Sequence, residues 1–252
     1  MHVLDNPVWH ALKGSQRALG RTTDFAGCFD VDVSRFGALA TERETEVSWR
    51  DLAQLLGPKG TVELTGDLPE PPHGWSVIDR FEGLQMVGDG IQGPIARGPQ
   101  HRGATAPSAI HTVPEARSVE TIAPSPERLG AVNVPEMLAL VEAAQPGPFE
   151  RRTIECGVYL GIRIDGNLVA MAGERIRPAG YSEISAVATH PDYRRLGLAK
   201  QVVLAVADTI IGRGDTPFLH ALLDNTAAIR LYESLGFTTR RPVTFRCLEA
   251  PG

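Results

Sequence analysis

The stretch Arg194-Arg195-Leu196-Gly197-Leu198-Ala199 lies where a strand passes into a helix, and it decides the fold. Before it, residues 183–189 read EISAVAT, which is typical of a β-strand; after it, apolar residues recur at helical spacing from residue 198 to residue 210. A glycine at this junction lets a ligand approach the backbone, and the first turn of the helix offers N–H groups without intrahelical partners. The pattern indicates a phosphate cradle, although a plain strand–helix connection also explains the glycine.

A second motif lies downstream and narrows these alternatives. Residues 225–237 read NTAAIRLYESLGF and follow another strand-like segment, residues 216–223. The order R-x-x-G-x-A after a strand, then N-x-x-A-x-x-L-Y-E-x-L-G-F, resembles the GNAT superfamily of acetyl-CoA-dependent N-acetyltransferases. The resemblance covers residues 119–248, about half of the chain. It implies a mixed α/β fold, with a mostly antiparallel central sheet and helices on both faces.

The periodicity of residues 115–252 agrees with that arrangement. Asp165-Gly166 is typical of a hairpin turn between two apolar alternating segments. We expect helices at 128–144, interrupted near Pro135, from Gly197 onward, and at 226–235. We expect strands at 119–122, 157–164, 168–176, 181–189, 216–223 and 243–248.

The chain is predicted to divide into three parts. Residues 93–114 hold four prolines and three glycines without periodicity and are interpreted as a linker or long loop. Residues 1–92 form a smaller α+β segment, with a helix at 48–56 and strands at 61–65, 75–78 and 84–87. Because chains of the superfamily sometimes carry a second, degenerate copy of the domain, this segment is interpreted as a degenerate GNAT-like half. Residues 115–252 form the GNAT domain.

Charge and cysteine content exclude several classes of protein. The net charge of −5 arises in the first 115 residues, which hold 10 Lys and Arg against 15 Asp and Glu. In residues 116–252 the acidic and basic side chains are equal in number. The chain shows no basic stripe for nucleic acid and no basic amphipathic helix or long apolar run for a membrane. Cys28, Cys156 and Cys247 have neither disulfide nor zinc spacing, so no metal is expected. With no secretion signal at its start, the chain is expected in the cytoplasm.

The expected co-substrate is acetyl-CoA. Its pyrophosphate would meet the N–H groups of Leu196, Gly197, Leu198, Ala199 and Lys200, with Arg194, Arg195 and Lys200 as nearby cations or as ordinary surface charges. The resemblance implies that the strand ending in Val187, Ala188 and Thr189 pairs with the pantetheine arm. Backbone N–H groups around Val187 and Ala188 would then polarise the acetyl carbonyl.

Glu183 is the predicted general base. An alkyl amine of pKa about 10.4 must lose a proton before it attacks, and Glu183 stands eleven residues before Arg194, as in the histone-acetylating branch of the family. On a regular strand Glu183, Ser185 and Val187 share one face, and apolar neighbours would raise the pKa of the carboxyl. The alternative is an exposed glutamate at a strand start.

Tyr232 is the predicted general acid, because the resemblance places this hydroxyl near the sulfur of coenzyme A; core packing is the alternative. Asn225 is expected to cap the helix that carries Tyr232 and also to touch the co-substrate. Glu174 and Arg175 are further candidates for acceptor contact, and His220 is a core histidine or a pocket wall. Acceptor pockets of the family would fall on residues 128–152 and the N-terminal segment.

The sequence thus predicts an enzyme that acetylates the primary amine of a small metabolite or amino acid by direct attack in a ternary complex. An acetyl-CoA sensor without activity and a protein-lysine acetyltransferase are the alternatives. A homodimer is left open.

Overall fold

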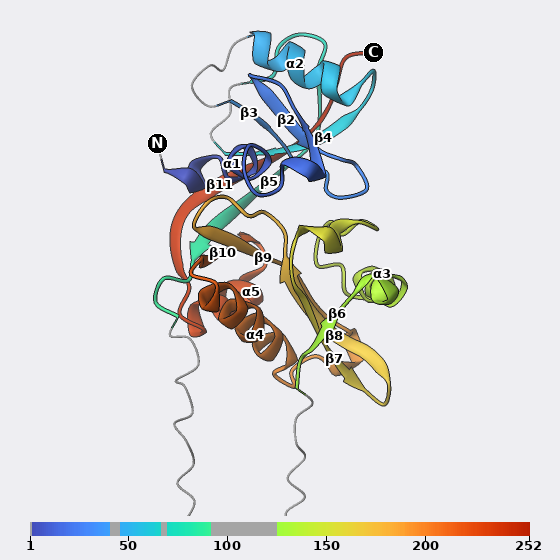
Figure 1. The fold of residues 1–252 in the computed structure, drawn as a ribbon, viewed down its shortest axis with the longest axis vertical. Coiled ribbons are helices and arrows are strands. Elements are labelled where there is room, and N and C mark those ends of the chain that lie inside the picture. Colours follow the sequence, from blue (N-terminus) through green and yellow to red (C-terminus); the bar gives the residue numbers. More distant parts are fainter. Residues whose placement is uncertain (1, 41–45, 67–69, 92–124) are drawn as a thin grey trace, which may run out of the picture.

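The computed structural model describes residues 2–40, 46–66, 70–91 and 125–252 (Figure 1). The helices are α1 (Pro7–Leu12), α2 (Glu46–Leu56), α3 (Val134–Ala144), α4 (Leu198–Gly212) and α5 (Thr226–Ser234). The strands are β1 (Gly20–Thr22), β2 (Ala26–Phe29), β3 (Gly37–Leu39), β4 (Thr61–Thr65), β5 (Ser76–Val87), β6 (Glu127–Leu129), β7 (Tyr159–Ile164), β8 (Asn167–Glu174), β9 (Tyr181–Thr189), β10 (Thr216–Leu222) and β11 (Thr238–Glu249).

Two sheets contain these strands. The small sheet has the order β1-β2-β3, and the large one has the order β4-β11-β5-β10-β9-β8-β7-β6. In the large sheet only β9 and β10 run parallel; every other neighbouring pair is antiparallel. The predicted mixed, mostly antiparallel sheet is therefore confirmed. The β7–β8 hairpin turns at Asp165-Gly166, both at positive φ, as a two-residue hairpin requires.

Helices cover both faces of the large sheet. One face packs on α4 and α5 through a core that includes Val202, Val206 and Ile210. The opposite face packs on α3 through Met137 and Leu140, and Figure 1 shows α3 on the other side of the strands from α4 and α5. Among the described helices, none is both long and apolar enough to cross a membrane.

Several predicted elements differ in detail, including the final strand β11, which begins at Thr238 rather than at residue 243. Arg128 belongs to strand β6 rather than to a helix, and Pro135 lies at the start of α3 instead of interrupting a helix. Proline fits there because its missing N–H would be unpaired in a first turn anyway. The strands predicted at 75–78 and 84–87 form one continuous strand, β5. The expected strand at 119–122 and the linker at 93–114 lie outside the described residues.

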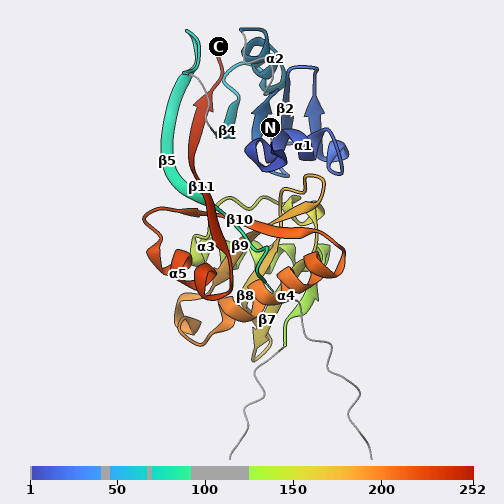
Figure 2. The same cartoon turned by 90° about the vertical axis from the view of Figure 1, so that its left-hand side faces the viewer.

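The N-terminal segment is built into the large sheet. β5 lies between β10 and β11, and it pairs with β11 from Ser76 to Val87. Figure 2 shows these two long strands running together from the N-terminal part of the chain into the part that carries α4 and α5. Since β4 joins the same sheet through β11, hydrogen bonds of one sheet cross the predicted boundary between residues 1–92 and 115–252.

Candidate active site

The central feature of the site is a divergence of two strands. β9 and β10 are paired only at Tyr181–Thr216, Ser182–Pro217 and Glu183–Phe218. Beyond Glu183, β9 continues to Thr189 and still pairs with β8 on its other side, while β10 turns to pair with β5. The β10-facing backbone edge of β9 after Glu183 is therefore open, and an extended ligand can add to it as a strand would.

A β-bulge lies at the start of this open edge. The register between β8 and β9 shifts between Met171 and Gly173, and Ala186 has φ of 50°. The bulge breaks the alternation of side chains, because one extra residue reverses which face the following residues occupy. Ala186 and Ala188 pack on the α3 side, whereas Val187 packs on the α4 side. The expectation that Val187 shares a face with Glu183 and Ser185 is therefore wrong.

The predicted phosphate cradle lies at the start of α4. Gly197 precedes this helix at φ of 75°; among the described residues, none fills its side-chain position and no side chain caps the helix there. Arg194, Arg195 and Lys200 are exposed around it, and within the described ranges none of the three forms an ion pair. An uncapped first turn with three unpaired cations is electrostatically suited to an anion.

The remaining predicted cofactor residues lie as follows. Leu196 is exposed before the helix; the side chain of Leu198 is buried in the core, and that of Ala199 is partly buried. Thr189, at the end of the open edge, has a buried hydroxyl that lacks a hydrogen-bond partner in the described residues. Asn225 caps α5, accepting a hydrogen bond from the Ala228 N–H at 3.1 Å.

Tyr232 is the buried residue of the exposed helix α5, and its ring packs edge-on against Phe237 at 6.0 Å. Burial raises the pKa of its hydroxyl to about 12. The hydroxyl therefore stays protonated at neutral pH. Within the part of the chain that the structure describes, no group hydrogen-bonds this hydroxyl, so it is free to donate to a ligand.

Glu183 lies at the point of divergence, but its carboxylate is not free. It is fully buried; Arg175 donates to both oxygens, from Nε at 3.0 Å and from Nη2 at 2.7 Å. His220 Nδ1 lies 2.8 Å from Oε1. Burial by itself raises the pKa of Glu183, but the charge of Arg175 and the bonds from His220 and Arg175 outweigh it and lower the pKa to about 2. The predicted rise in this pKa is wrong, and a carboxylate held so is a poor base.

The sequence did not indicate the network that holds Glu183. Gln85 Oε1 accepts from Arg240, so the Gln85 amide nitrogen faces His220 Nε2 at 3.2 Å. Because the Gln85 amide nitrogen is a donor, His220 Nε2 accepts from it and the ring proton lies on Nδ1. The Nδ1–H group of His220 then donates to Glu183. Gln85 belongs to β5, which carries neither motif, and Arg240 belongs to β11, three residues beyond the end of the second motif. Only the strand order brings these residues together.

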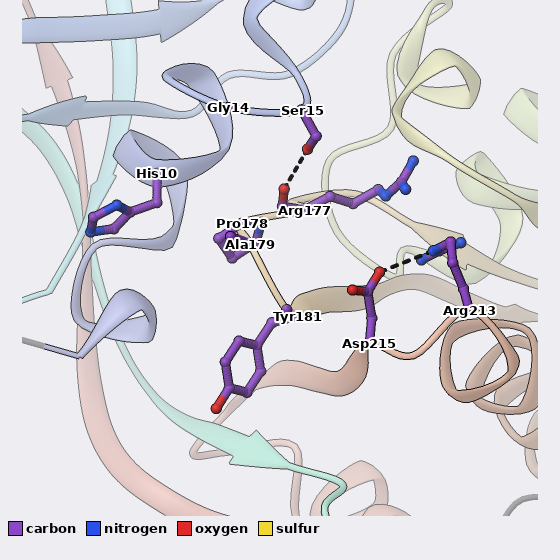
Figure 3. Close-up of a pocket in the computed structure, with 10 residues that line it drawn as sticks. His10, Gly14, Ser15, Arg177, Pro178, Ala179, Tyr181, Arg213 and Asp215 are labelled. Atoms are coloured by element: carbon purple, nitrogen blue, oxygen red, sulfur yellow. Dashed lines mark hydrogen bonds and ion pairs between the residues drawn. The ribbon is translucent and has the colours of Figure 1, made fainter.

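A separate pocket of about 350 Å³ lies between the N-terminal residues and the turn that precedes β9. Figure 3 shows His10 and Ser15 on one side of it and Arg177, Tyr181, Arg213 and Asp215 on the other. Arg213 donates to Asp215 and also to the buried Glu174. No predicted site residue lines this pocket, and its cations are already paired with carboxylates.

Several known proteins resemble this chain in sequence or in fold. Residues 159–246 match the model of the FR47-like protein family. A solved GNAT-family structure from Novosphingobium aromaticivorans DSM 12444 is 36% identical, with a TM-score of 0.79 and complete coverage of both chains. A GCN5-related N-acetyltransferase from Kribbella flavida shares the fold, with 18% identity, a TM-score of 0.60, and coverage of 97% of this chain and 94% of that one.

One curated relative also matches. The N-alpha-acetyltransferase RimI of Mycobacterium tuberculosis is 34% identical over 83 residues, which are 31% of this chain and 51% of that protein. The chain thus matches about half of that relative's length. Together with the full-length match above, these similarities show that the chain belongs to the GNAT family of acetyltransferases.

Proposed function

We propose that this protein transfers the acetyl group of acetyl-CoA to a primary amine of a small metabolite or amino acid, by direct attack in a ternary complex. The observation that carries the proposal is the open edge of β9 beyond Glu183, which leads to the uncapped start of α4. A strand edge suits an amide-containing arm, and a helix start suits a pyrophosphate.

The residues present fit acetyl-CoA along this path. Backbone groups of Val187, Ala188 and Thr189 would hold the pantetheine arm, and the N–H groups from Leu196 to Lys200 would hold the pyrophosphate. Arg194 and Arg195 add charge there. When bound, the co-substrate supplies an activated acetyl group. Tyr232, protonated at neutral pH, would donate a hydrogen bond to the departing sulfur.

The lowered pKa of Glu183 favours an acceptor that is readily neutral. Moving a proton from an alkyl ammonium of pKa about 10.4 to a carboxyl of pKa about 2 is uphill by roughly 11 kcal/mol. Releasing that proton to water at pH 7 costs about 4.6 kcal/mol, and an α-amino group of pKa about 8 costs only about 1.4 kcal/mol. We therefore favour the α-amino group of an amino acid or of a short peptide.

The similarity to RimI supports the same choice, because that relative is named as an N-alpha-acetyltransferase. A protein-lysine acceptor requires the costlier proton loss and is correspondingly less favoured.

The test is release of free coenzyme A from acetyl-CoA across a panel of amines. The panel contains free amino acids, polyamines, peptides with a free α-amino group, and acetyl-capped peptides with one lysine. The proposal expects the fastest release with α-amines, with acetylation at that nitrogen verified by mass spectrometry. Acetyl-CoA binding without release on any amine would refute the enzyme and favour a sensor. Release only with the capped lysine peptides would indicate a lysine acetyltransferase.

A further inference from the structure

Tyr159 carries a hydroxyl that is buried inside the protein. The residue is 1% exposed, and no hydrogen-bond partner for its hydroxyl occurs among the described residues. Burial raises the pKa of this hydroxyl well above its usual value, so it is never ionised near neutral pH. A buried polar group without a partner is costly and rare in folded proteins, and it calls for a specific explanation.

The side chain of Tyr159 crosses β8 in the direction of β9. Tyr159 pairs with Gly173 on β8, and Gly173 pairs with Ser185 on β9. A Cβ at Gly173 would lie 2.2 to 2.4 Å from Cδ1, Cε1 and Cγ of the tyrosine ring. The ring therefore occupies the place of the missing side chain, and its hydroxyl end extends past β8.

The hydroxyl thus approaches the divergence of β9 and β10 from the α3 side. Ser185 directly precedes the bulge at Ala186, and Glu183 is the last residue of β9 that pairs with β10. Cys156, Arg175, Glu183 and Glu174 all act electrostatically on the hydroxyl, so it lies in the same buried region as the Arg175–Glu183 ion pair. Phe149, 6% exposed, packs edge-on against the ring at 5.5 Å.

We propose that Tyr159 is an acceptor-binding residue, whose hydroxyl hydrogen-bonds the attacking amine where β9 and β10 diverge. This inference rests on the proposed function. A hydroxyl can donate and accept hydrogen bonds. The Tyr159 oxygen can therefore accept a hydrogen bond from an N–H of a neutral amine, which leaves the nitrogen lone pair free for attack. The hydroxyl is kept without an internal partner because its partner arrives with the substrate.

The test is Tyr159→Phe, which removes the hydroxyl and keeps the ring over Gly173. We expect kcat/KM for the best amine of the panel to fall about tenfold, the effect of one lost hydrogen bond, with acetyl-CoA affinity unchanged. The melting temperature should rise by about 2–4 °C, because an unpaired buried hydroxyl is removed. Tyr181→Phe is the matched control, since its hydroxyl lies 3.3 Å from His2 Nε2 at the surface; it should leave kcat/KM unchanged.

The outcomes separate this inference from the proposed function. If Tyr159→Phe keeps full kcat/KM, or lowers acetyl-CoA affinity instead, the inference is overturned while the enzyme stands. If the wild type acetylates no amine, the proposed function fails. The melting temperature of Tyr159→Phe can still be compared with that of the wild type. A fall in melting temperature would then show an internal partner and overturn the inference, whereas a rise supports a hydroxyl reserved for a ligand.

Discussion

Replacing Glu183 by glutamine should damage the fold more than it changes the pH dependence of catalysis. The substitution keeps the shape of the side chain and removes its charge, which leaves Arg175, with a side chain only 10% exposed, without its carboxylate. Breaking a buried ion pair from one side typically costs about 3–5 kcal/mol. The shift in the pKa of Glu183 from 4.5 to about 2, which arises from Arg175 and His220, corresponds to a similar figure of roughly 3 kcal/mol.

The sign of the pH effect follows from the direction of that shift. The folded pKa lies below the unfolded one, so the stabilisation by Glu183 is complete above pH about 4.5 and is lost as the pH falls towards about 2. The stability difference between wild type and Glu183→Gln should therefore be constant near neutrality and shrink in this acid window.

Two assays check this prediction. Urea unfolding at pH 7 should show a loss of roughly 3 kcal/mol, or a melting temperature lower by about 6–12 °C. The exposed Glu233→Gln is the matched control and should change stability by less than about 0.5 kcal/mol. For the folded fraction, any loss of kcat/KM should stay constant from pH 7 to 10. A loss that disappears as the pH rises, with stability intact, would restore Glu183 as the general base and refute the reasoning.

Three further predictions test other parts of the site. Acetyl-CoA at 100 times its Kd should raise the melting temperature by about 5–10 °C, and Gly197→Glu should abolish that rise. The control is Gly214→Glu, which should retain the rise, because Gly214 has a similar positive φ and open space but lies at the far end of α4. Tyr232→Phe should bind acetyl-CoA with nearly normal affinity but turn over roughly 10- to 100-fold more slowly; full-speed single-turnover chemistry would assign the residue to core packing. A chain of residues 115–252 lacks β4 and β5, so it should show no cooperative unfolding transition by circular dichroism; a sharp transition would show that the GNAT domain folds without the N-terminal segment.

The sequence by itself determined the elements that carry the two motifs. The strand at residues 181–189, the helix after Gly197 and the helix that Asn225 caps all follow from local patterns, namely alternation, helical spacing and capping chemistry. Such patterns involve residues close together in the sequence, so they can be recognised without knowing the rest of the fold. The motif spacing was also sufficient to indicate the family.

Tertiary structure alone decided the surroundings of these elements. Nothing local to Ser76–Val87 indicates that this strand enters the large sheet between β10 and β11. The bulge at Ala186 depends on the register with β8, and it separates Val187 from the face of Glu183. The pKa of Glu183 shows the same dependence: apolar burial alone would have raised it, but the fold places Arg175 and His220 against the carboxylate. Electrostatic energy depends on distances between residues far apart in the chain, and only the packed sheet sets those distances.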